Sequence, residues 1–155
     1  MKRDAVISEC GRYRYRLYRE WAQSDRMPIM WLMLNPSTAD ASIDDPTIRR
    51  CIAFSKAWGY GAMWVGNLYG LRATDPKFLF RFGIDEMSGP DNAKHLYQMS
   101  TASALIVCAW GAPGGTRIPL SLLAPGGFWC LGKTKSGAPR HPLYLASRTE
   151  LAAYP

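Results

Sequence analysis

Apolar residues recur along the chain in short runs separated by polar loops and by stretches with helical spacing. Residues 28–34 are nearly all apolar, and shorter runs of the same kind stand at 62–65, 104–109 and 128–131. Continuous apolar runs of this length are typical of strands buried on both faces, as in a parallel sheet. The pattern therefore predicts four buried strands.

The stretches between these runs predict connecting helices. Asp44 or Asp45 can cap a helix that begins at Pro46 and ends near Trp58, where Gly59 stops it. Other helices are expected from 75 to 82, over 92–103, over 118–123 and after residue 147, with a loop at 83–90 and an extended segment at 142–146. Alternating strands and helices predict an α/β fold with three layers, α/β/α, around a central, mostly parallel four-stranded sheet.

Strict alternation near the start of the chain predicts a β-hairpin over residues 5–20, with its turn at Cys10-Gly11. On its second strand Arg12, Arg14 and Arg16 should share one face, which is either solvated or suited to contacts with phosphates. We expect one α/β domain over 1–155, with the hairpin at 1–20 and the core at 28–146.

The charge of the chain favours anionic partners. The 155 residues carry a net charge of +7, and a basic domain of this size suits nucleic acid or nucleotides, although a mildly basic surface explains the charge equally well. The four cysteines lack the spacing of a zinc ribbon or of a sequence-local iron–sulfur motif. We expect no metal and no other cofactor. Without a signal peptide or a long apolar run, we expect a cytoplasmic protein with no membrane partner. The oligomeric state stays open.

Two polar side chains stand beside prolines at predicted strand ends. Asn35 follows the run at 28–34 and precedes Pro36, and His141 precedes Pro142. Ligands of open parallel sheets bind in the crevice at the carboxyl ends of the strands. An asparagine and a histidine brought together there suggest a site for chemistry on a nitrogenous ring.

Four motifs in order along the chain resemble the uracil-DNA glycosylase superfamily. They are Leu34-Asn35-Pro36-Ser37, Gly66-Asn67-Leu68 with Arg72-Ala73-Thr74 after it, Ala109-Trp110-Gly111 and His141-Pro142-Leu143, which together span about 110 residues. The resemblance implies a glycosylase-like fold and hydrolysis of an N-glycosidic bond in DNA or a nucleotide. The chain departs from that pattern at Ser37 and after Pro142, and it shows no counterpart of the loop that wedges a duplex open. This last departure disfavours double-stranded DNA more than it disfavours base binding.

Over nearly its full length the chain is similar to an uncharacterised bacterial and phage family, domain of unknown function 1643. The similarity rests on Asn35-Pro36-Ser37-Thr38-Ala39-Asp40, on Asp44-Asp45-Pro46-Thr47 and on the segment 139–144. That family names no activity and leaves the function open.

Three residues are candidates for catalysis. His141 can donate a hydrogen bond to the departing base, Asn35 orients a water as the glycosylase resemblance implies, and Asp40 is a candidate general base, as are its neighbours Asp44 and Asp45. The candidate substrate-binding residues are Pro36, Ser37, Asn67, Tyr69, Trp110, Lys133, Lys135 and Arg140.

Each candidate also has a structural interpretation. Asn35 is equally a turn residue, Asn67 equally fixes a loop, and the late cations equally form a solvated loop. His141 is also explained as a structural histidine held by hydrogen bonds, and Trp110 fits the core better than a stacking platform. Three functions are therefore open. The protein is a glycosylase-like enzyme, a binding module that keeps the pocket without the chemistry, or a protein-interaction accessory of phage or bacterial origin whose Trp and Tyr residues form a binding patch.

Overall fold

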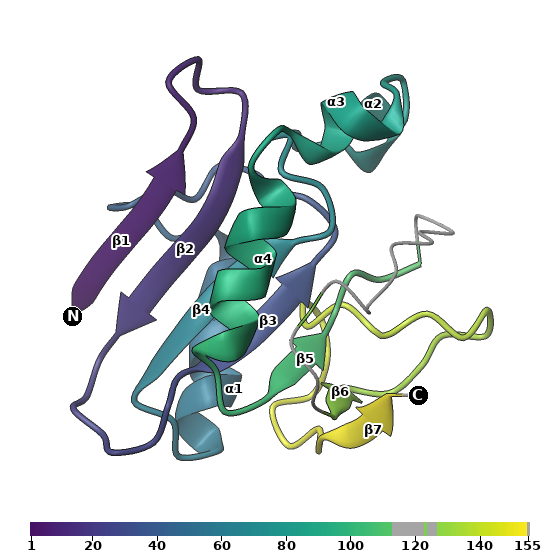
Figure 1. The fold of residues 1–155 in the computed structure, drawn as a ribbon. Coiled ribbons are helices and arrows are strands. Elements are labelled where there is room, and N and C mark those ends of the chain that lie inside the picture. Colours follow the sequence, from purple (N-terminus) through teal and green to yellow (C-terminus); the bar gives the residue numbers. More distant parts are fainter. Residues whose placement is uncertain (113–122, 124–126, 155) are drawn as a thin grey trace.

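A mixed β-sheet runs through the molecule (Figure 1). The computed structural model describes residues 1–112, 123 and 127–154. Within this part of the chain the sheet has seven strands in the order β1-β2-β4-β3-β5-β6-β7. The strands are β1 (Lys2–Ile7), β2 (Arg14–Glu20), β3 (Ile29–Met33), β4 (Ala62–Asn67), β5 (Ile106–Cys108), β6 (Phe128–Cys130) and β7 (Ala152–Tyr154).

The middle of the sheet is parallel and its two edges are antiparallel. β3 pairs in parallel with β4 on one side and with β5 on the other, and β6 continues in parallel from β5. The predicted four-stranded sheet is too small, because the hairpin β1–β2 adds to β4 and β7 adds to β6. β7 stands where a helix was expected after Ser147. It covers the edge of β6, and Tyr154 packs edge-to-face on Trp110.

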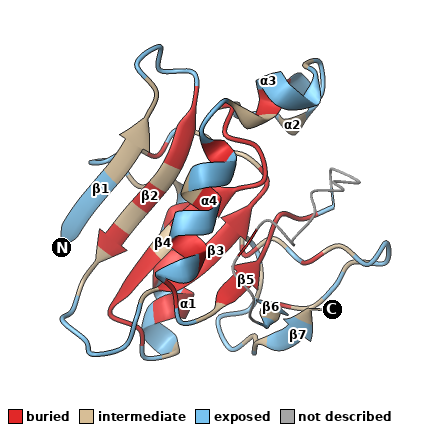
Figure 2. Cartoon of the chain, in the orientation of Figure 1, coloured by how far each residue is buried: buried red, intermediate tan, exposed pale blue. Residues whose placement is uncertain are grey.

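Helices cover both faces of this sheet (Figures 1 and 2). Side chains alternate along β3, so that Met30 and Leu32 pack in the same apolar cluster as residues of α4 (Asn92–Thr101). Trp31 packs instead with α1 (Pro46–Ala57) on the other face. Since every residue of β3 is buried, the expectation from its continuous apolar run is confirmed.

The start of α1 follows the predicted cap. The Asp45 side chain accepts a hydrogen bond from the Ile48 backbone N–H at 2.8 Å, and Pro46 occupies the first turn. Two short helices, α2 (Pro76–Leu79) and α3 (Ile84–Ser88), follow β4. α3 lies in the segment predicted as a loop, where it buries Met87. The helix expected over 118–123 lies, apart from Leu123, outside the described residues. No helix in the described part of the chain has the length and apolar character to span a membrane.

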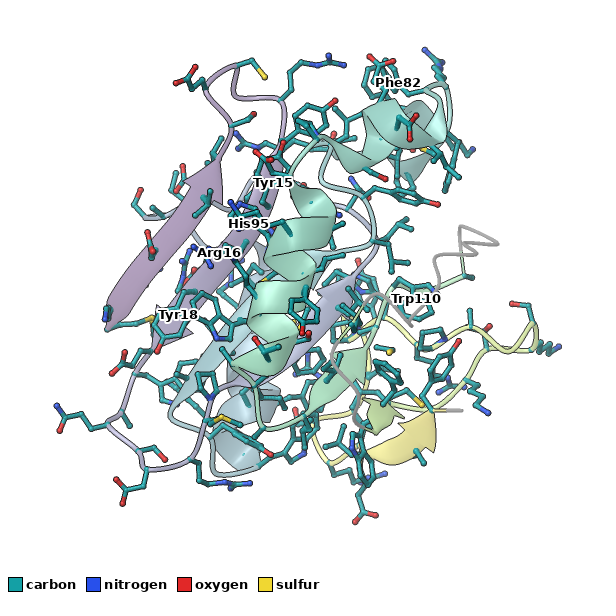
Figure 3. The ribbon with its side chains drawn as sticks, in the orientation of Figure 1. Tyr15, Arg16, Tyr18, Phe82, His95 and Trp110 are labelled. Atoms are coloured by element: carbon teal, nitrogen blue, oxygen red, sulfur yellow. The ribbon has the colours of Figure 1, made fainter. Side chains whose placement is uncertain are left out.

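A β-bulge in the hairpin changes which arginines share a face. Val6 pairs with Arg16 and Ile7 with Arg14, so Tyr15 is the extra residue on β2. Tyr15 stacks on His95 of α4 and Arg16 lies over Trp64, which places both on the α4 side (Figure 3). Arg14 points to the opposite side. The prediction that Arg14 and Arg16 share a face is therefore wrong.

Candidate functional site

A cavity of about 380 Å³ opens at the carboxyl ends of β3, β4 and β5. β3 leads into α1 on one face of the sheet, whereas β4 leads through α2 and α3 to α4 on the other. Neighbouring strands whose connections diverge in this way leave a crevice between their ends. The cavity is lined by Arg14, Met33, Leu34, Asn35, Ser37, Asp45, Thr47, Ile48, Val65, Asn67, Ala73, Thr74, Pro76, Trp110, Gly111, Ala112, His141 and Leu143.

Asn67 is the last residue of β4 and lines this cavity with a buried side chain. It is only 1% exposed, yet neither the Nδ2 nor the Oδ1 atom of its carboxamide has a hydrogen-bond partner. Its backbone carbonyl accepts a hydrogen bond from Asn92 Nδ2 at 3.0 Å, so the main chain at this point is held while the side chain is left unpaired. A buried polar group without a partner costs about 1–3 kcal/mol. Such a group in a cavity wall points to a ligand that pairs with it.

The loop after β3 brings Asn35 and Ser37 to the same cavity. Asn35 Nδ2 donates to the carbonyls of Ala73 at 2.7 Å and of Pro36 at 3.1 Å. Its amide hydrogens therefore tie two loops together, and within the described structure its Oδ1 accepts no hydrogen bond. Pro36 is buried, and its carbonyl also accepts from the Ala73 N–H at 2.9 Å, but Pro36 does not line the cavity.

His141 lines the cavity from the far end of the chain. Its Nδ1 accepts a hydrogen bond from the Leu143 backbone N–H at 3.2 Å, which leaves the proton of the neutral ring on Nε2. Burial lowers the pKa of His141, and the nearby charge of Asp45 opposes this only in part. The ring is thus a neutral Nε2–H donor at neutral pH.

Arg50 of α1 fixes the chain that follows His141. Its guanidinium donates to the carbonyls of Pro142 and Leu145 and to the Ser147 hydroxyl. Residues 142–145 form a turn and not the predicted extended segment, because these contacts fold the chain back over α1. The sequence does not reveal the role of Arg50, since its partners lie more than ninety residues away along the chain.

Of the three candidate carboxylates, Asp45 lines the cavity, and the other two do not. Asp40 accepts hydrogen bonds from the backbone N–H groups of Ser42 and Ile43, and these bonds lower its pKa. It therefore closes its own turn and does not face the site. Burial alone would raise the pKa of Asp44, but its ion pairs with Arg19 and Arg3, both 2.8 Å long, lower it on balance.

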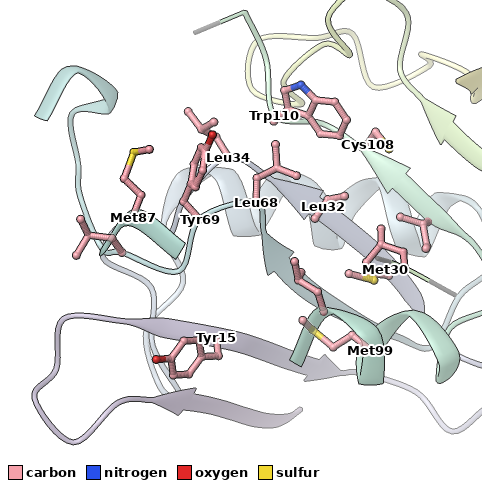
Figure 4. Packing of buried hydrophobic residues seen from close by; sticks show 14 of the residues in the cluster. Tyr15, Met30, Leu32, Leu34, Leu68, Tyr69, Met87, Met99, Cys108 and Trp110 are labelled. Carbon is pink, nitrogen blue, oxygen red and sulfur yellow. The ribbon is translucent and has the colours of Figure 1, made fainter. Parts of the chain in front are cut away.

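Only one of the two candidate stacking residues lines the cavity. Trp110, at the end of β5, lines the cavity while packing against the apolar cluster below it (Figure 4). Tyr69 lies in that cluster near Leu34 and Met87, is 4% exposed, and does not line the cavity. Its backbone N–H bonds to the Leu34 carbonyl, which continues the strand pairing and turns the ring toward the α4 side.

The late cations lie outside the cavity. Lys133 pairs with Pro139 through an isolated β-bridge, and the chain between them forms a small hairpin that leads to His141. Lys133, Lys135 and Arg140 are all exposed, and Lys133 lies over the Tyr154 ring at 5.9 Å. None of the three lines the cavity.

Arg14 is a site residue that the sequence placed on a hairpin face. It is 2% exposed and lines the same cavity as Asp45 and Asn67. No local signal in the sequence marks the bulge that turns it inward, because the bulge depends on the pairing of β2 with β1.

The described residues hold no group of three or more His, Cys, Asp or Glu side chains suited to a metal ion.

Comparison with known proteins identifies the family. The family model described as protein of unknown function (DUF1643) matches residues 14–143. The chain belongs to the DUF1643 family. The match begins at Arg14 and ends at Leu143, so the span shared with DUF1643 contains every residue that lines the cavity. No curated protein and no solved structure matches the chain.

Proposed function

We propose that the protein binds a nucleobase, free or as part of a nucleotide or a single strand, in the cavity at the strand ends. The observation that carries this proposal is the unpaired, buried carboxamide of Asn67. A carboxamide offers one acceptor and two donors in a single plane, which matches the adjacent donor and acceptor on the edge of a base.

The rest of the cavity wall suits a flat ring. Met33, Leu34, Ile48 and Val65 supply apolar surface, and the indole of Trp110 supplies an aromatic one. Stacking of a base on an aromatic side chain contributes about 1–3 kcal/mol. His141 adds a neutral Nε2–H donor for a carbonyl oxygen of the ring. The net charge of +7 attracts anionic ligands of this class.

Hydrolysis of an N-glycosidic bond is a second candidate function, favoured by one further observation. The cavity holds both a carboxylate, Asp45, and the His141 donor. In such a reaction the bond between the base nitrogen and the sugar carbon breaks, with the electron pair leaving on the base. Water then adds its hydroxyl to the sugar carbon while Asp45 accepts the proton, and His141 stabilises the departing base. In this scheme Asp45 replaces Asp40 as the general base, and Asn35 Oδ1 helps to hold the water.

Titration calorimetry with free bases, nucleosides and nucleotides tests the binding proposal. We expect at least one base to bind, and Asn67→Leu to weaken that binding at least about tenfold, since a buried hydrogen-bonded contact is lost. Gln98→Leu makes the same kind of change on the exposed side of α4 and should leave affinity unchanged. The absence of binding across the whole panel with folded protein would contradict the proposal and favour a protein-interaction role.

Base release separates the enzyme from the binding module. Single-stranded DNA carrying deaminated or modified bases is incubated with the wild-type protein and with Asp45→Asn, which keeps a capping side chain on α1. Release by the wild type and its loss in Asp45→Asn would support hydrolysis. Binding without release would support a module that has no chemistry.

A further inference from the structure

A second buried group in the cavity wall lacks a partner. Arg14 is 2% exposed, its Nη1 donates to the Ala39 carbonyl at 2.8 Å, and its Nε is buried with no hydrogen-bond partner. Burying a guanidinium charge is costly unless it is paired. The bulge in β2 turns this charge into the cavity and not toward solvent.

Arg19, on the same strand, shows how the fold satisfies a buried arginine. It is fully buried, and its Nε donates to Asp44 Oδ1 at 2.8 Å. Its remaining N–H groups donate to four backbone carbonyls, those of Asp4, Tyr18, Asp40 and Ile43. Arg14 makes one such contact. The fold can therefore supply a buried arginine with a full set of hydrogen-bond partners. Arg14 lacks such a set because it lies in the cavity wall.

Asp45 is the acidic residue in the same wall, and it leaves Arg14 without an ion pair. The salt bridges among the described residues join Arg3 and Arg19 to Asp44 and Arg12 to Glu86. Burial lowers the pKa of Arg14 to about 10, and Asp45 opposes this shift. At neutral pH the cavity thus contains a guanidinium that is charged and not fully paired.

We propose that Arg14 binds a phosphate group carried by the same ligand whose base faces Asn67, so the ligand is a nucleoside phosphate and not a free base or nucleoside. The base end of this assignment rests on the proposed function. A guanidinium presents parallel N–H donors that match two oxygens of a phosphate. The phosphate belongs either to a free nucleotide or to a short strand. A strand carries further nucleotides that can also contact the protein, whereas a free nucleotide does not.

Calorimetry with matched ligands tests the assignment. Nucleosides, their 5′-monophosphates and trinucleotides of the same base are titrated into the wild type, Arg14→Met and Lys94→Gln. We expect the monophosphate to bind at least about tenfold more tightly than the nucleoside, and Arg14→Met to abolish this difference while nucleoside affinity stays within about twofold. Lys94→Gln removes one exposed charge and should preserve the difference. A trinucleotide that binds more tightly than the monophosphate identifies a strand as the source of the phosphate, and equal affinity identifies a free nucleotide.

A second experiment uses inorganic phosphate, which tests the anion site without any recognition of a base. Phosphate should raise the melting temperature of the wild type but not of Arg14→Met, and Asp45→Asn should strengthen the effect by removing a repelling charge. If nucleosides and nucleotides all fail while phosphate acts through Arg14, the proposed function is wrong and the anion site stands. If phosphate acts equally on both proteins, or nucleoside and monophosphate bind alike, the inference is wrong. Should Arg14→Met fail to fold, Arg14→Lys, which keeps the charge without the fork, should retain only part of the preference.

Discussion

Asn92 holds the strand end on which Asn67 stands with an unpaired side chain. The Nδ2 atom of Asn92 donates to the backbone carbonyl of Asn67 at 3.0 Å and to that of Leu68 at 3.2 Å. Both asparagines are almost fully buried. Asn92 uses its Nδ2 to fix the main chain and leaves only its Oδ1 without a partner, whereas Asn67 leaves both polar atoms of its carboxamide unpaired in a cavity wall. We therefore expect the two residues to have opposite net effects on stability.

Replacement of each asparagine by leucine should separate these effects. Asn67→Leu should raise the free energy of unfolding by about 1 kcal/mol, because an unpaired buried group gives way to an apolar one of similar size. Asn92→Leu should lower it by about 1–3 kcal/mol, because two buried carbonyls lose their donor. Urea denaturation measures both. Equal losses of stability in the two variants would contradict a functional origin for the unpaired carboxamide.

The two buried arginines of β2 provide a second contrast. Arg14→Met should leave the free energy of unfolding unchanged or raise it, since replacing an incompletely paired buried charge with an apolar side chain is often stabilising. Arg19→Met should lower it by about 3 kcal/mol or more, because Asp44 and several carbonyls lose their partner. Thermal and urea unfolding of both variants test this. A large loss of unfolding free energy in Arg14→Met would show that Arg14 stabilises the fold. It would contradict the expectation that this side chain is kept for a ligand.

The two histidines predict how stability depends on pH. Burial lowers the pKa of both His141 and His95 from the ordinary value of 6.5, and the charge of Arg16 lowers that of His95 further. The unfolded chain therefore binds more protons than the folded one below pH 6.5. The stability contributed by the neutral rings is fully present above pH 6.5 and is lost as pH falls through the folded pKa values.

Unfolding measurements between pH 4.5 and 7.5 should show this loss, and His141→Gln should remove the part that belongs to His141. Nitrogen NMR of the wild type should show His141 as the neutral Nε2–H tautomer at pH 7, since its Nδ1 accepts from Leu143. A folded pKa of His141 equal to 6.5 would abolish its contribution, and a higher one would reverse the sign; either result would contradict the burial argument.

The parts of the fold that depend on nearby residues could be predicted from the sequence. The continuous apolar run of β3 reports burial on both faces, and Asp45 next to Pro46 specifies the start of α1 within four residues. β7 could not be predicted, because three residues form a strand only where the edge of β6 is open to them. The bulge that turns Arg14 inward depends in the same way on distant pairing with β1.

In the candidate site, too, some residues could be predicted from the sequence and others depend on distant pairing. Asn35 and His141 stand beside prolines at predicted strand ends, and Asn67 belongs to a motif that resembles the glycosylases. The structure brings all three to one cavity. Trp110 and Tyr69 both follow strands as well, but the rotation of the chain beyond each strand end decides which ring meets the cavity. That rotation is set by backbone pairing, such as the bond from Tyr69 N–H to the Leu34 carbonyl, which sequence spacing does not reveal.

Arg50 should act as a positioning residue for His141, and its neighbour Arg49 provides a matched control. Arg50 donates to three groups of the segment 142–147, whereas Arg49 donates to the Asp44 carbonyl at 2.7 Å. Arg50→Met should release the turn after His141, weaken base binding by about tenfold and move the pKa of His141 back toward 6.5 as the ring becomes more exposed. Arg49→Met, with the same loss of charge in the same helix, should change neither quantity.

Calorimetry and NMR titration of the two variants measure affinity and the pKa of His141 together. The pKa separates positioning from a general loss of stability, because a destabilised but folded protein would keep the buried environment of the ring. If Arg50→Met weakens binding while the pKa of His141 is unchanged, the turn at 142–147 does not hold the imidazole in place. That result would contradict the positioning role of Arg50. If affinity and pKa change together, the order of the segment 142–147 on α1 sets both the tautomer and the orientation of the donor that the proposed base would meet.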